Sequence, residues 1–210
     1  MLDAAETLIY ERGFDALTVS ELVQRSRTSV GSFYARFEDK AALLRAVQNR
    51  ALERIESTFE GRAHNRPATG SLAESVHAEI ETFVRMVSRD APLIRAFYAQ
   101  GADPVLHKRV ARTDQLHFSI FRAAMLEHVG EIRHTDPERA ILFAYSTHLT
   151  IVMSLSWTIG RADAPFSPAE TTAELSRMLT AYLQGGGLPD PSRRPRASRK
   201  RRADSDPLRR

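Results

Sequence analysis

Side chains suited to hydrogen bonding with DNA gather in one short stretch of the chain. Three small residues, Ser29, Gly31 and Ser32, are followed by longer polar ones, Tyr34, Arg36 and Lys40. Small polar groups near the start of a helix let its backbone and hydroxyls approach base edges, and longer basic or phenolic groups reach phosphates. The residue types therefore favour recognition of a duplex by one short helix.

Two short helices joined by a tight turn are predicted to position these side chains. Thr18 and Glu21 have the spacing of a capping box, and Val19 begins an apolar face of a first helix. The segment 26–28, Ser-Arg-Thr, is prone to form a turn. A second helix is expected to start near Ser29 and to bury Val30 or Phe33 and Phe37. This is the pattern of a helix-turn-helix, whose second helix can enter the major groove.

The same pattern also permits a less specific interpretation. Helix hairpins are common on the surface of helical proteins, and Tyr34 could be half-buried there without a role in binding. Residue types alone leave both interpretations open.

Residues 1–47 as a whole resemble the DNA-binding domain of the TetR-type transcriptional repressors. The resemblance rests on the following positions at fixed spacing: Ala4-Ala5, Gly13-Phe14, Thr18-Val19, Ser29 to Tyr34, Phe37, Lys40 and Leu43-Leu44. It implies a homodimer that places one recognition helix in each half of a palindromic operator, and a helical C-terminal domain that binds a small-molecule inducer. By motif position it assigns DNA contacts to Thr18, Ser20, Ser29, Val30, Gly31, Ser32, Tyr34, Arg36 and Lys40.

The chain departs from the family pattern in the turn. Arg27 stands where a small residue or glycine is usual, Thr28 where an aliphatic residue is common, and Arg36 where an aromatic residue or histidine often occurs. If residue 27 is left-handed, an arginine there costs about 1 kcal/mol relative to glycine. These changes leave the operator sequence undetermined.

The remaining chain also has helical periodicity, with no competing strand pattern. Gly13 is expected to end a first helix over 2–12, and Asp39 to cap a helix reaching about residue 60. Residues 61–70 are expected to form a loop. Further helices are predicted over about 71–89, 92–98, 104–128, 136–157 and 167–184. The last two are expected to open with a cap followed by proline, at Asp136-Pro137 and at Ser167-Pro168. The prediction is an all-α protein of about nine helices.

The last two helices are the expected site of dimerisation. The helix from Asp136 is apolar on nearly every side, and a helix of that kind is buried all round, here against its own domain and a partner. The final helix carries Leu175, Met178, Leu179, Tyr182 and Leu183. In the family that the chain resembles, these two helices pair with their symmetry mates about a twofold axis.

Aromatic, methionine and histidine residues of the middle helices are the candidates for an inducer pocket. Apolar ligand sites combine such walls with a few polar groups. Equally, residues of this type are more often plain core. The candidates are Phe83, Met86, Phe97, Tyr98, His117, Phe121, Met125, Tyr145, His148 and Trp157.

Other classes of site find little support. The chain has no cysteine, which excludes disulfides, thiolate metal sites and cysteine nucleophiles. His77 and Glu81 share a helix face, but a structural metal site usually needs four ligands, so a solvated pair is the better interpretation. No motif of a hydrolase, phosphate-binding loop or dinucleotide site occurs. We expect no enzyme activity, no metal and no cofactor. With no signal peptide or long apolar run, a cytoplasmic protein without membrane contact is expected.

Positive charge is concentrated at the end of the chain. Residues 189–210 contain nine basic residues and three aspartates, a net charge of +6, whereas the whole chain carries +4. The segment is rich in proline and poor in apolar residues, so it is expected to be disordered. It could act as an electrostatic arm on DNA or as a solubilising extension.

These inferences divide the chain into residues 1–47, a DNA-binding head, residues 48–187, a ligand-binding and dimerisation domain, and residues 188–210, a basic tail. The predicted function is a ligand-responsive repressor that an inducer releases from DNA. The alternatives are a constitutive, sequence-tolerant DNA-binding protein without inducer, and a helical small-molecule-binding protein or enzyme with a degenerate head.

Overall fold

The computed structural model describes residues 1–65, 69–99, 104–159, 161 and 163–185. This part of the chain forms eight α-helices and one short 3-10 helix, with no strand. The expectation of an all-α protein with about nine helices is confirmed. The predicted basic tail, residues 188–210, lies outside the described residues.

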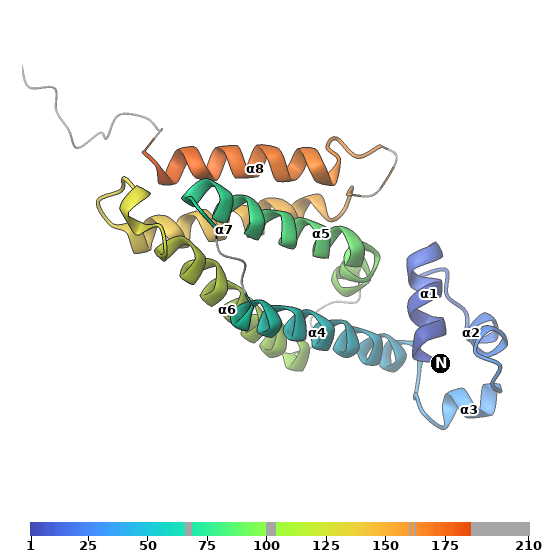
Figure 1. Ribbon diagram of the computed structural model, residues 1–210. Helices are drawn as coiled ribbons and strands as arrows, with labels where there is room; N and C mark the ends of the chain where they lie inside the picture. Colours follow the sequence, from blue (N-terminus) through green and yellow to red (C-terminus); the bar gives the residue numbers. More distant parts are fainter. Residues whose placement is uncertain (66–68, 100–103, 160, 162, 186–210) are drawn as a thin grey trace, which may run out of the picture.

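Three short helices form the head at one end of the molecule (Figure 1). They are α1 (Leu2–Arg12), α2 (Val19–Arg25) and α3 (Val30–Tyr34). Gly13 ends α1 with a φ of 83°, as predicted for a glycine stop. The amide of Glu21 donates to the Thr18 hydroxyl at 3.2 Å, so Thr18 caps α2. The Glu21 carboxylate forms an ion pair with Arg12 instead of completing the capping box.

A long helix connects the head to the body. α4 (Lys40–His64) begins at the predicted cap, Asp39, whose carboxylate accepts from the Ala42 amide at 2.6 Å. It packs along α6 (Pro104–Leu126), where Arg109 binds Glu56 at 2.8 Å. α4 continues four residues beyond the predicted end because Arg62 forms an ion pair at 2.6 Å with the buried Glu79, which holds the extra turn.

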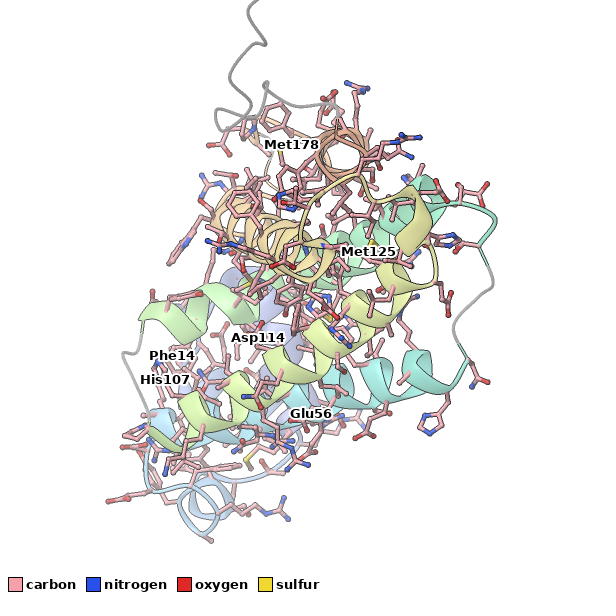
Figure 2. All side chains as sticks on the ribbon, turned by 90° about the vertical axis from the view of Figure 1, so that its left-hand side faces the viewer. Phe14, Glu56, His107, Asp114, Met125 and Met178 are labelled. Carbon is pink, nitrogen blue, oxygen red and sulfur yellow. The ribbon has the colours of Figure 1, made fainter. Side chains whose placement is uncertain are left out.

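The body is completed by α5 (Leu72–Ala99), the 3-10 helix η1 (Val129–Glu131), α7 (Pro137–Leu155) and α8 (Pro168–Leu183). α5 packs mainly against α8, and α7 lies beside both α6 and α8. The predicted caps at Asp136 and Ser167 are present, and Ser167 with Glu170 forms a complete capping box. In Figure 2, Met178 of α8 lies near the top, above Asp114 of α6 and Glu56 of α4.

One predicted break is absent. The sequence suggested two helices around Pro92, but α5 runs through it as one helix. A proline inside a helix costs about 3 kcal/mol, since it removes one hydrogen bond and crowds the preceding turn. Leu93 and Ala96 after the proline are buried in the core of the head, and burial of Leu93 alone contributes about 1.5–3 kcal/mol, which offsets much of this cost.

Two hydrophobic clusters form the core, and α5 contributes to both. The body cluster joins α5, α6, α7 and α8, with α5 residues up to Ala91. The head cluster joins α1 to α4 and also contains Leu93 and Ala96 of α5. The two clusters therefore meet near Pro92 inside a single helix, where Ile94 still packs against the body cluster.

Candidate DNA interface and ligand site

The second helix of the head presents its polar side to solvent. Ser29 caps α3, its hydroxyl accepting from the Ser32 amide at 3.1 Å. Phe33 is fully buried, which turns the opposite face outward. In the same helix Val30 is 49% and Tyr34 59% exposed. Of the two expected anchors, Phe33 rather than Val30 is the buried one.

The turn before this helix is closed by its own side chains. The Ser26 hydroxyl donates to the Leu22 carbonyl at 2.7 Å and lies 2.9 Å from the Thr28 hydroxyl. Between them Arg27 has a φ of 52°, the only positive φ of a non-glycine residue among those described. The left-handed conformation suspected from the sequence is therefore present at Arg27.

Ion pairs fix α1 against α2. Arg25 binds both carboxylate oxygens of Glu11, at 2.7 and 2.8 Å, and Arg12 pairs with Glu21. These two arginines are neutralised within the head. Lys40 lies over the Phe14 ring, 5.0 Å from its centroid.

The structure places the predicted DNA contacts at the start of α2, along α3 and just after it, and at the start of α4. Eight of the nine are exposed and Lys40 is half-buried, the full set being Thr18, Ser20, Ser29, Val30, Gly31, Ser32, Tyr34, Arg36 and Lys40. Arg27, exposed at the turn, was not in this set. The sequence marks this position, because Arg27 stands where a small residue or glycine is usual.

Half of the candidate ligand residues come together in the body as a buried histidine cluster. We define this cluster as Phe59, Phe83, His117, Phe121, Tyr145 and His148. His117 stacks between Phe59 and Phe83, with both ring centroids 4.6 Å away. His148 stacks on Phe121 at 5.0 Å. Phe59 is not among the ten candidate ligand residues, because its sequence position gives no sign that α4 packs on α6.

The other five candidate ligand residues do not belong to the buried histidine cluster. Tyr98 and Trp157 are 58% and 47% exposed and form a separate surface pair, with ring centroids 5.8 Å apart. Met125 is fully buried, and Met86 packs at the edge of the body cluster. The side chain of Phe97 lies outside the described residues.

Burial keeps both histidines of the cluster neutral. It lowers the pKa of His117 to about 3, with a further contribution from His148 and Arg62, and the pKa of His148 to about 4. Tyr145 donates to the Asp114 carboxylate at 2.5 Å. Burial and this hydrogen bond raise the pKa of Tyr145. The cluster is thus an uncharged, partly polar interior.

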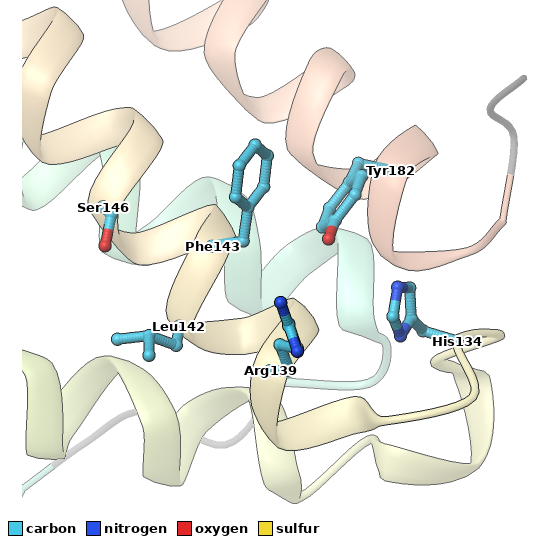
Figure 3. A pocket seen from close by; sticks show the side chains of 6 residues that line it. All are labelled: His134, Arg139, Leu142, Phe143, Ser146 and Tyr182. Atoms are coloured by element: carbon cyan, nitrogen blue, oxygen red, sulfur yellow. The ribbon is translucent and has the colours of Figure 1, made fainter.

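A surface pocket of about 310 Å³ lies between α7 and α8 (Figure 3). It is lined by His134, Arg139, Leu142, Phe143, Ser146 and Tyr182. None of the ten candidate ligand residues lines this pocket, and it opens on the face where dimerisation was expected.

The described residues contain no group of three side chains placed to hold a metal ion. His77 contacts the Ser176 hydroxyl of α8 at 3.3 Å, and Glu81 lies 3.8 Å from Arg85. In the same part of the chain, no helix is both long enough and apolar enough to cross a bilayer.

Two family models match the chain. The model described as "Bacterial regulatory proteins, tetR family" matches residues 1–47. The model described as "Tetracyclin repressor-like, C-terminal domain" matches residues 71–183, more than half of the chain.

The chain is also similar to curated regulators. It is 34% identical over 64 residues to the uncharacterized HTH-type transcriptional regulator YvdT of Bacillus subtilis (strain 168), covering 30% of this chain and 33% of that one. It is 28% identical over 93 residues to the HTH-type transcriptional repressor ComR of Escherichia coli (strain K12), covering 43% of each. The matches thus span less than half the length of these relatives.

Solved structures share the fold across nearly the whole chain. A TetR/AcrR-family regulator from Thermobifida fusca superposes with a TM-score of 0.65 at 20% identity, covering 85% of this chain and 93% of that one. FadR from Bacillus subtilis, solved in complex with stearoyl-CoA, gives 0.58 at 16% identity, covering 88% and 96%. With both halves matched by models of one family and the fold shared with its members, the chain belongs to the TetR family of transcriptional regulators.

Proposed function

We propose that this protein is a ligand-responsive repressor that binds a palindromic operator as a homodimer and is released by a small apolar inducer. The observation that carries the proposal is the course of α5, whose buried residues up to Ala91 belong to the body cluster and whose Leu93 and Ala96 belong to the head cluster. A change in the body can therefore reach the DNA-binding head through one helix.

In this proposal α3 reads the major groove. Ser29, Gly31 and Ser32 offer small groups to base edges, and Tyr34 and Arg36 contact the flanking phosphates. The exposure of Tyr34 supports this role, since a structural tyrosine would bury its ring. Residues 1–47 would act as the head, 48–187 as the regulatory body and 188–210 as a basic extension.

Exposed apolar residues on α7 and α8 support dimerisation through these helices. Leu142 and Phe143 of α7 are 49% and 58% exposed, and Met178 of α8 is 43% exposed. Phe143 lies 5.2 Å from Tyr182 of α8, measured between ring centroids, so the two helices share one apolar face. A twofold axis across this face would bury the same patch on both protomers.

The inducer would bind at the buried histidine cluster. The stearoyl-CoA complex of FadR supports ligand binding by a protein of this fold. In this chain Phe83 places α5 at the cluster, 4.6 Å from His117 between ring centroids. A ligand there would displace α5 from its position in the DNA-bound form.

Polar contacts between α5 and the head would transmit this displacement to α1. Asp90 is buried and accepts a hydrogen bond from Tyr10 of α1 at 2.6 Å. An inducer that binds better to a form in which α5 and α1 have shifted would lower the population with correctly spaced recognition helices.

The head is tested by replacing Tyr34 with Ala and, separately, with Phe. With a pool of random duplexes at low salt, fluorescence anisotropy should show weaker binding for Tyr34→Ala, because phosphate contacts dominate non-specific affinity. Tyr34→Phe should lose less, since it keeps the ring that lies against Phe33. Equal affinities for all three proteins would show that the head does not bind DNA.

A further inference from the structure

The hydrogen bonds of the buried histidine cluster fix which ring nitrogens carry protons. Nδ1 of His148 lies 3.3 Å from the carbonyl oxygen of Ala144. A carbonyl oxygen only accepts hydrogen bonds, so Nδ1 carries the proton and Nε2 has a free lone pair. The ring is neutral, because burial lowers its pKa to about 4.

Nε2 of His148 has no hydrogen-bond partner in the part of the chain that the structure describes, although the residue is fully buried. Nearly all buried polar atoms in proteins are paired, which makes this atom an exception. The neighbouring rings of Phe83 and Phe121 offer only C–H groups, which are weak donors. The missing partner must therefore be a stronger donor, an O–H or N–H group.

The contact with Tyr145 shows that His117 also carries its proton on Nδ1. The single phenolic proton of Tyr145 goes to the Asp114 carboxylate at 2.5 Å. The contact of 3.3 Å between the Tyr145 oxygen and Nδ1 of His117 then requires that Nδ1 donates. His117 is thus also a neutral ring with Nε2 as the acceptor, and its centroid is 5.5 Å from that of His148.

The charges around the cluster disfavour an anion. Arg62, the cation that acts on His117, is paired with the buried Glu79 at 2.6 Å. Asp114 adds a second carboxylate at the edge of the cluster. A bound carboxylate or phosphate would face two lone pairs and two carboxylates, and Arg62, whose Nε has no hydrogen-bond partner in the described part of the chain, already pairs with Glu79 through a terminal nitrogen.

We propose that His148 is a hydrogen-bond acceptor for a neutral inducer that carries a hydroxyl or N–H group on an aromatic or apolar body. The polar group donates to Nε2 of His148, and the body packs against Phe83 and Phe121. This inference rests on the proposed function, because it assigns the chemical class of the inducer.

Matched pairs of small probes test the donor requirement. We would measure binding of phenols and their methyl ethers, for example 4-propylphenol and 4-propylanisole, and of indole and 1-methylindole, to the full chain by isothermal titration calorimetry. In the wild-type protein the member with a donor should bind about tenfold tighter in at least one pair. This preference should disappear in His148→Leu and remain in His64→Leu, a variant of an exposed histidine.

A spectroscopic measurement on the wild-type protein provides a second test, which does not depend on the folding of His148→Leu. In ¹⁵N-histidine-labelled wild-type protein, the Nε2 resonance of His148 should have the shift of an unprotonated nitrogen and move when the phenol is added, but not when the anisole is added. The inference is overturned if the donor and its methylated partner bind equally, if neither binds, or if the preference survives in His148→Leu. Because none of these measurements involves DNA, a phenol that binds as described but fails to release DNA would count against the proposed function alone.

Discussion

At the residue scale, the energetic cost of the backbone conformation at two positions of the head can be measured separately from the contacts of the side chains there. Arg27 has a φ of 52° in the turn, and Gly13 has a φ of 83° and a ψ of 164° at the end of α1. The left-handed region costs a residue with a Cβ about 1 kcal/mol, and the region of Gly13 is almost restricted to glycine.

Arg27→Gly should therefore raise the free energy of unfolding of the protein by up to about 1 kcal/mol, and Gly13→Ala should lower it by about 1–3 kcal/mol. An added Cβ at Gly13 meets no atom within 4 Å, so the loss would come from the backbone alone. Urea denaturation of both variants measures the two changes. If Arg27→Gly were destabilising, Arg27 would be held by contacts rather than strained.

The two buried histidines give stability a specific dependence on pH. In the unfolded chain a histidine titrates at a pKa of 6.5, whereas in the folded protein the pKa is about 3 for His117 and about 4 for His148. Between these values the unfolded chain binds more protons than the folded one. Acidification from pH 6.5 towards pH 4 therefore destabilises the protein, and above pH 6.5 the histidines have no such effect.

We expect the free energy of unfolding to fall by up to about 1.4 kcal/mol per histidine for each pH unit in this window. Urea denaturation from pH 7.5 to 4.5 measures the slope, which should be smaller in His148→Leu and unchanged in His64→Gln. An unchanged slope in His148→Leu would mean that this ring is already protonated or solvent-exposed in the folded protein.

At the element scale, the contact between α1 and α5 joins the head to the body. Tyr10 donates to Asp90, which also binds Arg89 at 2.6 Å. Arg54 of α4 binds Glu6 of α1 at 2.9 Å beside this contact. Three helices thus meet in one network of charged and polar groups, and the position of α1 depends on that of α5.

Tyr10→Phe should lower the free energy of unfolding by about 1.5–3 kcal/mol, since it removes a hydrogen bond to a buried carboxylate. The same change at Tyr34, whose ring is exposed, should leave stability unchanged. Thermal and urea denaturation of the two variants provide the comparison. Equal effects of the two substitutions would contradict the proposed junction.

Local patterns predicted the elements whose ends are set by local chemistry. Thr18, Asp39, Asp136 and Ser167 cap helices as expected, because cap and amide lie within three residues of each other. The prediction failed at Pro92, since the continuation of α5 depends on burial of Leu93 against the distant helices of the head. The candidate sites differ in the same way. The spacing of residues along the chain identified the DNA contacts from Ser29 to Arg36. The contact of Phe59 with His117 could not be predicted, because it depends on the packing of α4 on α6.

At the scale of the whole molecule, the exposed face of α7 and α8 is the part of the proposal most open to a direct test. Phe143→Arg should convert the dimer to a monomer in sedimentation velocity, because it places a charge at the centre of the apolar face. Val110→Arg on α6, also a change at an exposed apolar residue, should leave the dimer intact. A dimer that persists in Phe143→Arg would require another interface.

The measurement that tests the central claim most directly is selection of bound sequences from a pool of random duplexes by the full chain at about 0.15 M salt, where non-specific phosphate contacts are partly screened. Two identical recognition helices related by a twofold axis predict recovery of one inverted repeat, with half-sites about one helical turn apart or a multiple of it. Recovery of duplexes without a shared sequence would contradict the account and favour a sequence-tolerant DNA-binding protein.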